Sequence, residues 1–278
     1  MSLEQYDLHT HSRYSDGTTS VSEIARLVKA QGLKGFALTD HDTMRGWEEG
    51  RSAASELQLD FVPGVELTTR LGSLGVHLLG YGFDSADPRL TLRLRQIREA
   101  RSHRAEEMVQ RLAQDFPIDW EEIVANSSES IGRPHIADAL VRQGIVRDRG
   151  AAFATLLSHT SKYYVPNDMF DTVEAVEIVT GAGGVTVVAH PAAIRNDEVL
   201  DRREIALLVD AGLRGIELRH PENNPQHIPA LEQIAKDMDL LITGSSDFHG
   251  AGKANRIGDE TTDAATVYKL REAMRFPN

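Results

Sequence analysis

The stretch YDLHTHSRYSDGTTS, residues 6–20, holds two histidines two positions apart and an aspartate in the segment that follows. The residue pattern predicts a strand over Gln5–Thr10 and then a polar loop. Because side chains alternate between the two faces of a strand, His9 and His11 point the same way, about 7 Å apart along the backbone. Two imidazoles in this arrangement can converge on one cation, and Asp16 can add a carboxylate.

Short apolar runs and helical stretches alternate along much of the chain. Amphipathic patterns predict helices at Val21–Gln31, where Ser20 can cap the first turn, and at Thr172–Ala182 and Arg203–Ala211. Such alternation predicts parallel strands with helices outside them. The expected strands are Gln5–Thr10, Gly35–Thr39, Asp60–Val62, Val76–Tyr81, Val185–His190, Gly215–Arg219 and Leu240–Gly244.

One long segment breaks the alternation. From Asp87 to Lys162 the sequence predicts no strand, but one long charged helix or two, followed by shorter helices. We therefore expect an α/β barrel-like body made of residues 1–86 and 163–278. Residues 87–162 are expected to form a helical insertion that contributes to substrate binding.

The composition narrows the class of protein. The chain has 278 residues, 41% apolar and 26% charged, which is ordinary for a globular protein, and it has no cysteine for disulfides or thiolate metal sites. Its net charge of −12 argues against a duplex-DNA-binding protein, which would normally be basic, and can conceal bound divalent cations. No signal-peptide pattern or membrane-length apolar run is visible, so a cytoplasmic protein without a membrane partner is expected.

Further histidines and carboxylates fall at or beside the ends of the expected strands. In a barrel of parallel strands most of them would meet at the C-terminal rim, where such barrels carry out chemistry. A lone histidine pair is more often solvated or hydrogen-bonded than metal-bound, but a set of this size is hard to obtain by chance. Mixed nitrogen and oxygen ligands suit Zn, Mn or Fe, and nine of them exceed what one ion takes, so two or three divalent ions are expected. The nine candidates are His9, His11, Asp16, His41, Glu66, His77, His190, Asp247 and His249.

These residues stand in motifs that resemble the polymerase and histidinol phosphatase (PHP) family. The motifs are HTHSRYSDG at 9–17, TDHD at 39–42, GVE at 64–66, AHP at 189–191 and SDFH at 246–249. The resemblance implies a distorted, TIM-like (β/α)₇ barrel holding three metals, with manganese first among them and iron or zinc also compatible. It also implies that Asp40 and Asp42 orient the histidines.

The resemblance further implies which residues share a metal. His9, His11, Glu66 and Asp247 would hold the first ion. Glu66 would bridge to a second ion, held also by His77 and His190. Asp16, His41 and His249 would hold the third ion.

Paired metals activate a bridging water and clamp both sides of an in-line phosphoryl displacement, so phosphoester hydrolysis is the leading hypothesis. Amide or ring hydrolysis is the enzymatic competitor. His220 and Asp247 are the predicted catalytic residues. His220 follows another expected strand and could protonate the leaving oxygen or hold a substrate phosphate, with a supporting hydrogen bond as the alternative.

Three residues near or within the insertion, together with His220, are predicted to bind substrate. Arg133 offers a planar fork for phosphate, with His135 two residues on and Lys162 as a further positive charge. The alternative is that Arg133 pairs with a nearby acid. Tyr163 and Tyr164 are expected to pack the insertion against the barrel rather than stack on a base.

Within the family, GRPHIA at 132–137 resembles a branch that removes the 3′-phosphate from nucleoside 3′,5′-bisphosphates. That branch also trims short 5′-phosphorylated RNA. The resemblance implies a small nucleotide or short single-stranded oligonucleotide as substrate and no duplex DNA, and the sequence predicts no oligomeric state. Histidinol-phosphate phosphatase activity and a non-catalytic, metal-stabilised nucleotide-binding module are the alternatives.

Overall fold

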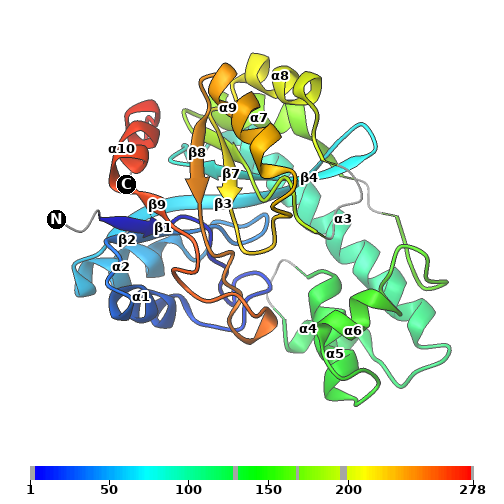
Figure 1. Cartoon of the computed structure of the whole chain (residues 1–278). Coiled ribbons are helices and arrows are strands. Elements are labelled where there is room, and N and C mark those ends of the chain that lie inside the picture. The colour runs from blue at the N-terminus through cyan, green and yellow to red at the C-terminus, as the bar shows by residue number, and fades with distance from the viewer. Residues whose placement is uncertain (1–3, 128–130, 167–168, 195–198, 277–278) are drawn as a thin grey trace.

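The computed structural model describes residues 4–127, 131–166, 169–194 and 199–276. A strongly curved, nearly closed sheet forms its body, with helices around the outside (Figure 1). The strands are β1 (Gln5–Asp7), β2 (Gly35–Leu38), β3 (Asp60–Leu71), β4 (Leu74–Tyr81), β5 (Phe170–Asp171), β6 (Val185–Val188), β7 (Gly215–Arg219), β8 (Leu241–Gly244) and β9 (Thr262–Asp263). Their order in the sheet is β8-β7-β6-β4-β3-β2-β1-β9, and β5 pairs with β3. This arrangement confirms the predicted distorted α/β barrel.

One hairpin departs from the expected parallel arrangement. β3 continues to Leu71 and pairs antiparallel with β4, and β4 is also antiparallel to β6. The prediction that this strand ends at Val62 is therefore wrong. The hairpin turns at Gly72, whose φ of 59° lies in the left-handed region that favours glycine. Because β4 runs backwards, its first residues lie at the rim where the parallel strands end.

Hydrogen bonds of Thr262 in β9 and Asp7 in β1 connect these strands to the end of β8 and so close the barrel. The hydroxyl of Thr262 donates to the carbonyl of Gly244 at 2.7 Å and accepts from its N–H at 2.9 Å. The Asp7 carboxylate accepts from the backbone N–H groups of Ser246 and Gly258, each at 3.0 Å. Burial raises the pKa of Asp7 to about 6, although these hydrogen bonds oppose the shift.

The helices outside the insertion are α1 (Val21–Ala30), α2 (Trp47–Leu57), α7 (Thr172–Gly181), α8 (Arg202–Ala211), α9 (Ile228–Asp237) and α10 (Ala264–Ala273), with a 3₁₀ turn η1 (Gly250–Gly252). Four of the barrel helices, α1, α7, α8 and α10, begin at a residue whose side chain caps the first turn. Ser20 accepts from the Glu23 N–H and starts the first helix, whose apolar face is buried at Val21, Ile24 and Val28.

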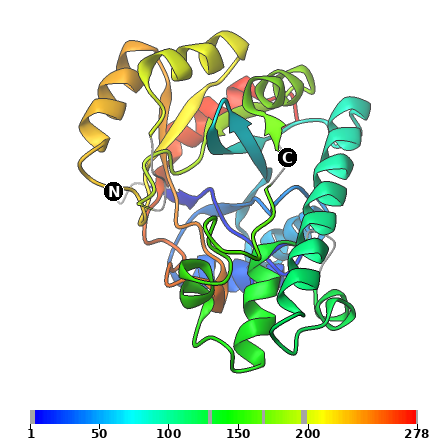
Figure 2. The same cartoon turned by 90° about the vertical axis from the view of Figure 1, so that its right-hand side faces the viewer.

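The insertion forms a helical lobe beside the barrel. Its helices are α3 (Pro88–Leu112), α4 (Trp120–Ala125), α5 (Arg133–Arg142) and α6 (Arg149–Ala154), with no strand among the described residues of this segment. The long charged stretch is a single helix, capped by Asp87. Leu90 and Leu94 of α3 pack in the barrel core, whereas Ala105 and Met108 pack in a separate core within the lobe. In Figure 2, α3 runs along the side of the barrel, and α4–α6 gather beyond it.

None of the helices in the described ranges is both long enough and apolar enough to cross a membrane.

Leu78→Ala should lower the free energy of unfolding in urea by about 2–5 kcal/mol, because it leaves a cavity in the fully buried contact of β4 with β3 and β6. The matched control is Leu207→Ala on α8, where the side chain is 54% exposed and the change should stay within about 0.5 kcal/mol. Equal effects of the two substitutions would contradict this account of the core.

Candidate metal centre

All nine predicted ligands meet at one rim of the barrel. They come from the loops after β1, β2 and β8, the middle of β3, the start of β4 and the end of β6. Neighbouring histidine rings lie close together, with centroids 4.0 Å apart for His11 and His249 and 5.2 Å apart for His77 and His190. His77 is the most accessible of them, with 30% of its side chain exposed. Because β4 runs antiparallel to β3 and β6, His77 in the first half of this strand lies at the rim.

The first ligand group has the spacing expected around an ion. The Nε2 atoms of His9 and His11 lie 3.2 and 3.1 Å from Glu66 Oε2, and 3.5 and 3.4 Å from Asp247 Oδ1. Both Nε2 atoms and Asp247 Oδ1 are buried and make no hydrogen bond, so they face a shared space rather than one another. Ligand atoms held at about 2.1 Å in a tetrahedron lie about 3.4 Å apart, which fits these separations.

The two oxygens of Glu66 face different imidazoles. Oε1 lies 2.7 Å from His77 Nδ1 and 3.1 Å from His190 Nε2. Oε2 faces His9, His11 and also His41, whose Nδ1 is 3.2 Å away. A carboxylate divided in this way can bridge two ions.

A further group surrounds Asp16. His249 Nε2 lies 3.3 Å from one carboxylate oxygen, and His41 Nε2 lies 3.7 Å from the other. His11 Nδ1 is 3.6 Å away, so His11 lies between this group and the first. His249 Nδ1 is 2.8 Å from the carbonyl of Asp247, which can only accept. The proton of a neutral His249 is therefore on Nδ1, and the lone pair of Nε2 faces the ligand space.

Electrostatics favour charged carboxylates at this rim. Burial raises the pKa of Asp16, Glu66 and Asp247, but neighbouring histidines, and Lys253 in the case of Asp247, outweigh it and hold each pKa well below its usual range. Burial lowers the pKa of His41, whereas at His9 and His11 burial is outweighed by the nearby carboxylates, which raise the pKa of His9 well above its usual value and that of His11 to about 9.

Two residues of the site were not predicted from the sequence, the buried Glu217 and the partly exposed Lys253. Glu217 in β7 accepts from His9 Nδ1 at 3.2 Å and from the backbone N–H of His190 at 2.9 Å. The bond fixes the proton of His9 on Nδ1 and leaves Nε2 for a metal. Lys253 donates to Asp247 Oδ2 at 2.5 Å and lies 3.1 Å from Glu222. A lone acid inside the apolar strand GIELR was the available signal for Glu217.

A model of the PHP domain matches residues 7–163. The chain belongs to the PHP family. It is 33% identical to the 3′,5′-nucleoside bisphosphate phosphatase of Chromobacterium violaceum, over 95% of this chain and 94% of that protein. It is 32% identical to a 5′-3′ exoribonuclease of Haemophilus influenzae, over 88% of this chain and 90% of that protein. The solved structure of a proposed metal-dependent phosphoesterase from Bifidobacterium adolescentis matches with a TM-score of 0.94 at 39% identity, covering 97% of this chain and 96% of that one.

The PHP protein is therefore a phosphoric ester hydrolase, and the alternative of a non-catalytic module is wrong. The unpartnered buried nitrogens and the nitrogen–oxygen donor set fit the metals of a metal-dependent phosphoesterase.

His220 lies beside the first ligand group of the PHP enzyme. Its Nδ1 accepts from the Glu222 N–H at 3.1 Å, so a neutral ring carries its proton on Nε2. Nε2 is buried, makes no hydrogen bond and lies 3.3 Å from Asp247 Oδ2. Together with His9 and Glu217, His220 also forms a group whose ligand atoms lie within 4.8 Å of one another.

The predicted substrate residues of the PHP enzyme have partners within the protein. The Arg133 guanidinium stacks over the Phe153 ring at 5.3 Å. His135 engages both ring nitrogens with backbone groups, so a substrate contact would require one of these bonds to break. Lys162 is 71% exposed and pairs with Asp115 at 2.8 Å. Their roles toward substrate stay predictions.

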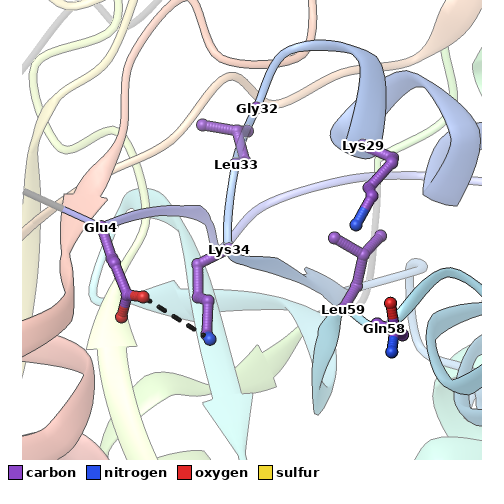
Figure 3. A pocket seen from close by; sticks show the side chains of 7 residues that line it. All are labelled: Glu4, Lys29, Gly32, Leu33, Lys34, Gln58 and Leu59. Carbon is purple, nitrogen blue, oxygen red and sulfur yellow. Dashed lines mark ion pairs between the residues drawn. The ribbon is translucent and has the colours of Figure 1, made fainter. Parts of the chain in front are cut away.

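A hollow of about 360 Å³ lies at the other end of the barrel, where β1–β3 begin (Figure 3). Its charged pair is Glu4 and Lys34, 3.5 Å apart and both largely exposed. It contains no histidine and is separate from the ligand rim.

Glu217→Gln should weaken metal binding by about 10–100-fold. The substitution removes the charge that faces His9 Nδ1, and the amide no longer fixes the proton of His9 on that nitrogen. Metal content after dialysis against a series of buffered Mn²⁺ concentrations measures the change. Glu232→Gln, on the exposed face of α9, is the control and should bind metal as the unmodified protein does. Equal affinities in the two variants would contradict the role of Glu217.

Proposed function

We propose that this PHP enzyme hydrolyses the 3′-phosphate ester of nucleoside 3′,5′-bisphosphates to a 5′-nucleotide and phosphate. Short 5′-phosphorylated single-stranded oligonucleotides are the second substrate of the same site. The observation that carries the proposal is Glu66, whose two oxygens face separate sets of imidazoles at the rim. The relatives support the choice of substrate, because one is named a bisphosphate phosphatase and another a 5′-3′ exoribonuclease.

The proposed cofactors are two or three divalent ions, with manganese preferred and iron or zinc compatible with the same donors. They would be held by His9, His11, Glu66 and Asp247, by Glu66 with His77 and His190, and by Asp16, His41 and His249. Bound ions of this kind supply an activated water and neutralise the charge that develops on the phosphoryl oxygens.

The protein groups then have separate tasks. Water adds its oxygen to phosphorus and gives up a proton, the bond from phosphorus to the 3′-oxygen breaks, and the leaving oxygen takes a proton. We assign the leaving-group proton to His220 Nε2, since Nδ1 already accepts from Glu222, and the proton given up by the water restores the ring to its starting form. Lys253 lies against the outer oxygen of Asp247 and holds that carboxylate charged and oriented.

We assign the 5′-phosphate to Arg133, at the first position of α5. Stacking on Phe153 fixes the plane of the guanidinium before substrate arrives, which reduces the entropy lost on binding. Lys162 is a weaker candidate because it already pairs with Asp115.

Mn²⁺-loaded protein should release phosphate and 5′-AMP from adenosine 3′,5′-bisphosphate, and a chelator should abolish the release. His9→Ala should lower the rate by more than about 100-fold, beyond the cost of losing a supporting partner. His103→Ala, on the exposed face of α3, is the control. If metal-loaded protein released nothing, the bisphosphate proposal would fail, and 5′-phosphorylated oligonucleotides and histidinol phosphate would be assayed next.

Arg133→Ala should raise KM for the bisphosphate by about 10–100-fold, the value of a charge-assisted hydrogen bond, with kcat changed less. The 5′-phosphate keeps its charge throughout the reaction, so Arg133 stabilises the bound substrate and the transition state equally. Arg95→Ala is the control, because Arg95 is exposed on α3. The assignment is refuted by an unchanged KM, or by a loss confined to kcat.

A further inference from the structure

The helical insertion contacts two of the loops that carry predicted ligands. We call residues 8–20 the Asp16 loop and residues 39–46 the His41 loop; they connect β1 to α1 and β2 to α2. Figure 1 shows α5 and α6 beside the loops at this end of the barrel.

Arg149 of α6 is the central contact. Its Nε and Nη2 atoms donate to the two carboxylate oxygens of Asp138 at 2.6 and 2.7 Å, which fixes the guanidinium plane. Its Nη1 donates to the backbone carbonyl of Asp16 at 3.1 Å, and the side chain is only 13% exposed. A Cβ atom on Gly252 would lie 2.1 Å from Nη1, so the guanidinium also packs tightly against the turn that follows His249.

His135 of α5 makes a second contact with the Asp16 loop. Its Nδ1 accepts from the Gly132 N–H at 3.1 Å, so the proton is on Nε2, which donates to the carbonyl of Ser15 at 3.0 Å. Burial lowers the pKa of His135, which favours this neutral form. Two neighbouring carbonyls of the loop are thus held by two different helices of the insertion.

The His41 loop is held by α3. Arg101 donates to Asp42 Oδ2 at 3.0 Å, and Arg98 donates to the Asp42 carbonyl at 2.7 Å. Asp42 has a φ of 56°, in the left-handed region that is uncommon for residues other than glycine. From the barrel side, Asp40 accepts from Ser12 and Ser15. Asp40 and Asp42 therefore hold groups of the two loops that carry predicted ligands, and their orienting role toward the histidines stays a prediction.

The other two ligand groups depend on the barrel instead. His9 and His190 are oriented by Glu217, and Glu66 lies within β3. Among the contacts described, only the group of Asp16, His41 and His249 takes the positions of its loops from the insertion.

We infer that Arg149, fixed by Asp138, is a positioning residue for the ion held by Asp16, His41 and His249. The insertion thereby sets the occupancy of this one metal site separately from the other two. The inference rests on the metal centre of the proposed function, but not on the substrate.

The test counts Mn²⁺ ions per chain over a range of free Mn²⁺, with full-length protein and no substrate. Arg149→Ala should weaken one ion by about 10–100-fold and leave the others unchanged. Asp138→Asn should shift the same ion in the same direction, Arg149→Lys should restore part of the affinity, and high free Mn²⁺ should refill the site. Arg147→Ala is the control, because Arg147 is 85% exposed and pairs with Asp148.

Asp16→Asn identifies which ion is lost. If Arg149 acts on this site, the double variant with Arg149→Ala loses the same single ion as Asp16→Asn alone. The inference would be overturned if the double variant lost a second ion, or if Arg149→Ala weakened all ions equally or none. It would also be overturned if the unmodified protein bound no more than two ions. Correct ion counts with no bisphosphate hydrolysis would refute only the proposed function.

Discussion

The buried carboxylate of Glu66 is the charge around which the rim is organised. Five imidazole nitrogens lie 2.7–3.2 Å from its two oxygens. An ionised carboxylate removed from water is costly unless it is paired, and neutral imidazoles compensate it only partly. Protonating several crowded rings would create repulsion among them. Bound divalent cations would resolve both problems at once, since they would neutralise the carboxylate and leave the rings neutral.

The topology of the sheet makes this crowding possible. Parallel strands deliver His9, His41 and His190 from their C-terminal ends, whereas β4 delivers His77 from its start because it runs backwards. The register pairs Thr68 with His77, two positions beyond Glu66 on β3. A strictly parallel barrel would have carried His77 to the opposite rim, so the hairpin at Gly72 is a requirement of the site.

The candidate metal ligands could be identified from the sequence because they lie at or beside the ends of the expected strands. Histidines and carboxylates that terminate apolar runs are conspicuous, and the structure brings all nine candidates together. The length of β3 could not be predicted, because Pro63 and Gly64 indicate a break that sheet pairing overrides. Glu217 was missed because a single acid inside a strand is a weak signal, and its partner His9 lies 208 residues away. Arg149 was missed because its partner is a backbone carbonyl 133 residues away, which no spacing in the sequence indicates.

The single helix α3 links the barrel and the insertion mechanically. Its first turns pack in the barrel core and its later turns in the core of the lobe, so the lobe cannot shift without disturbing barrel packing. The same lobe carries Arg133, the proposed phosphate anchor, and Arg149, the proposed support of one metal site. Both residues lie on helices of one small core, so packing within the lobe fixes their positions relative to each other. If Arg133 binds the 5′-phosphate while the 3′-phosphate lies at the metals, the distance between the two phosphates selects the substrate. This favours a single nucleoside with a phosphate on each side.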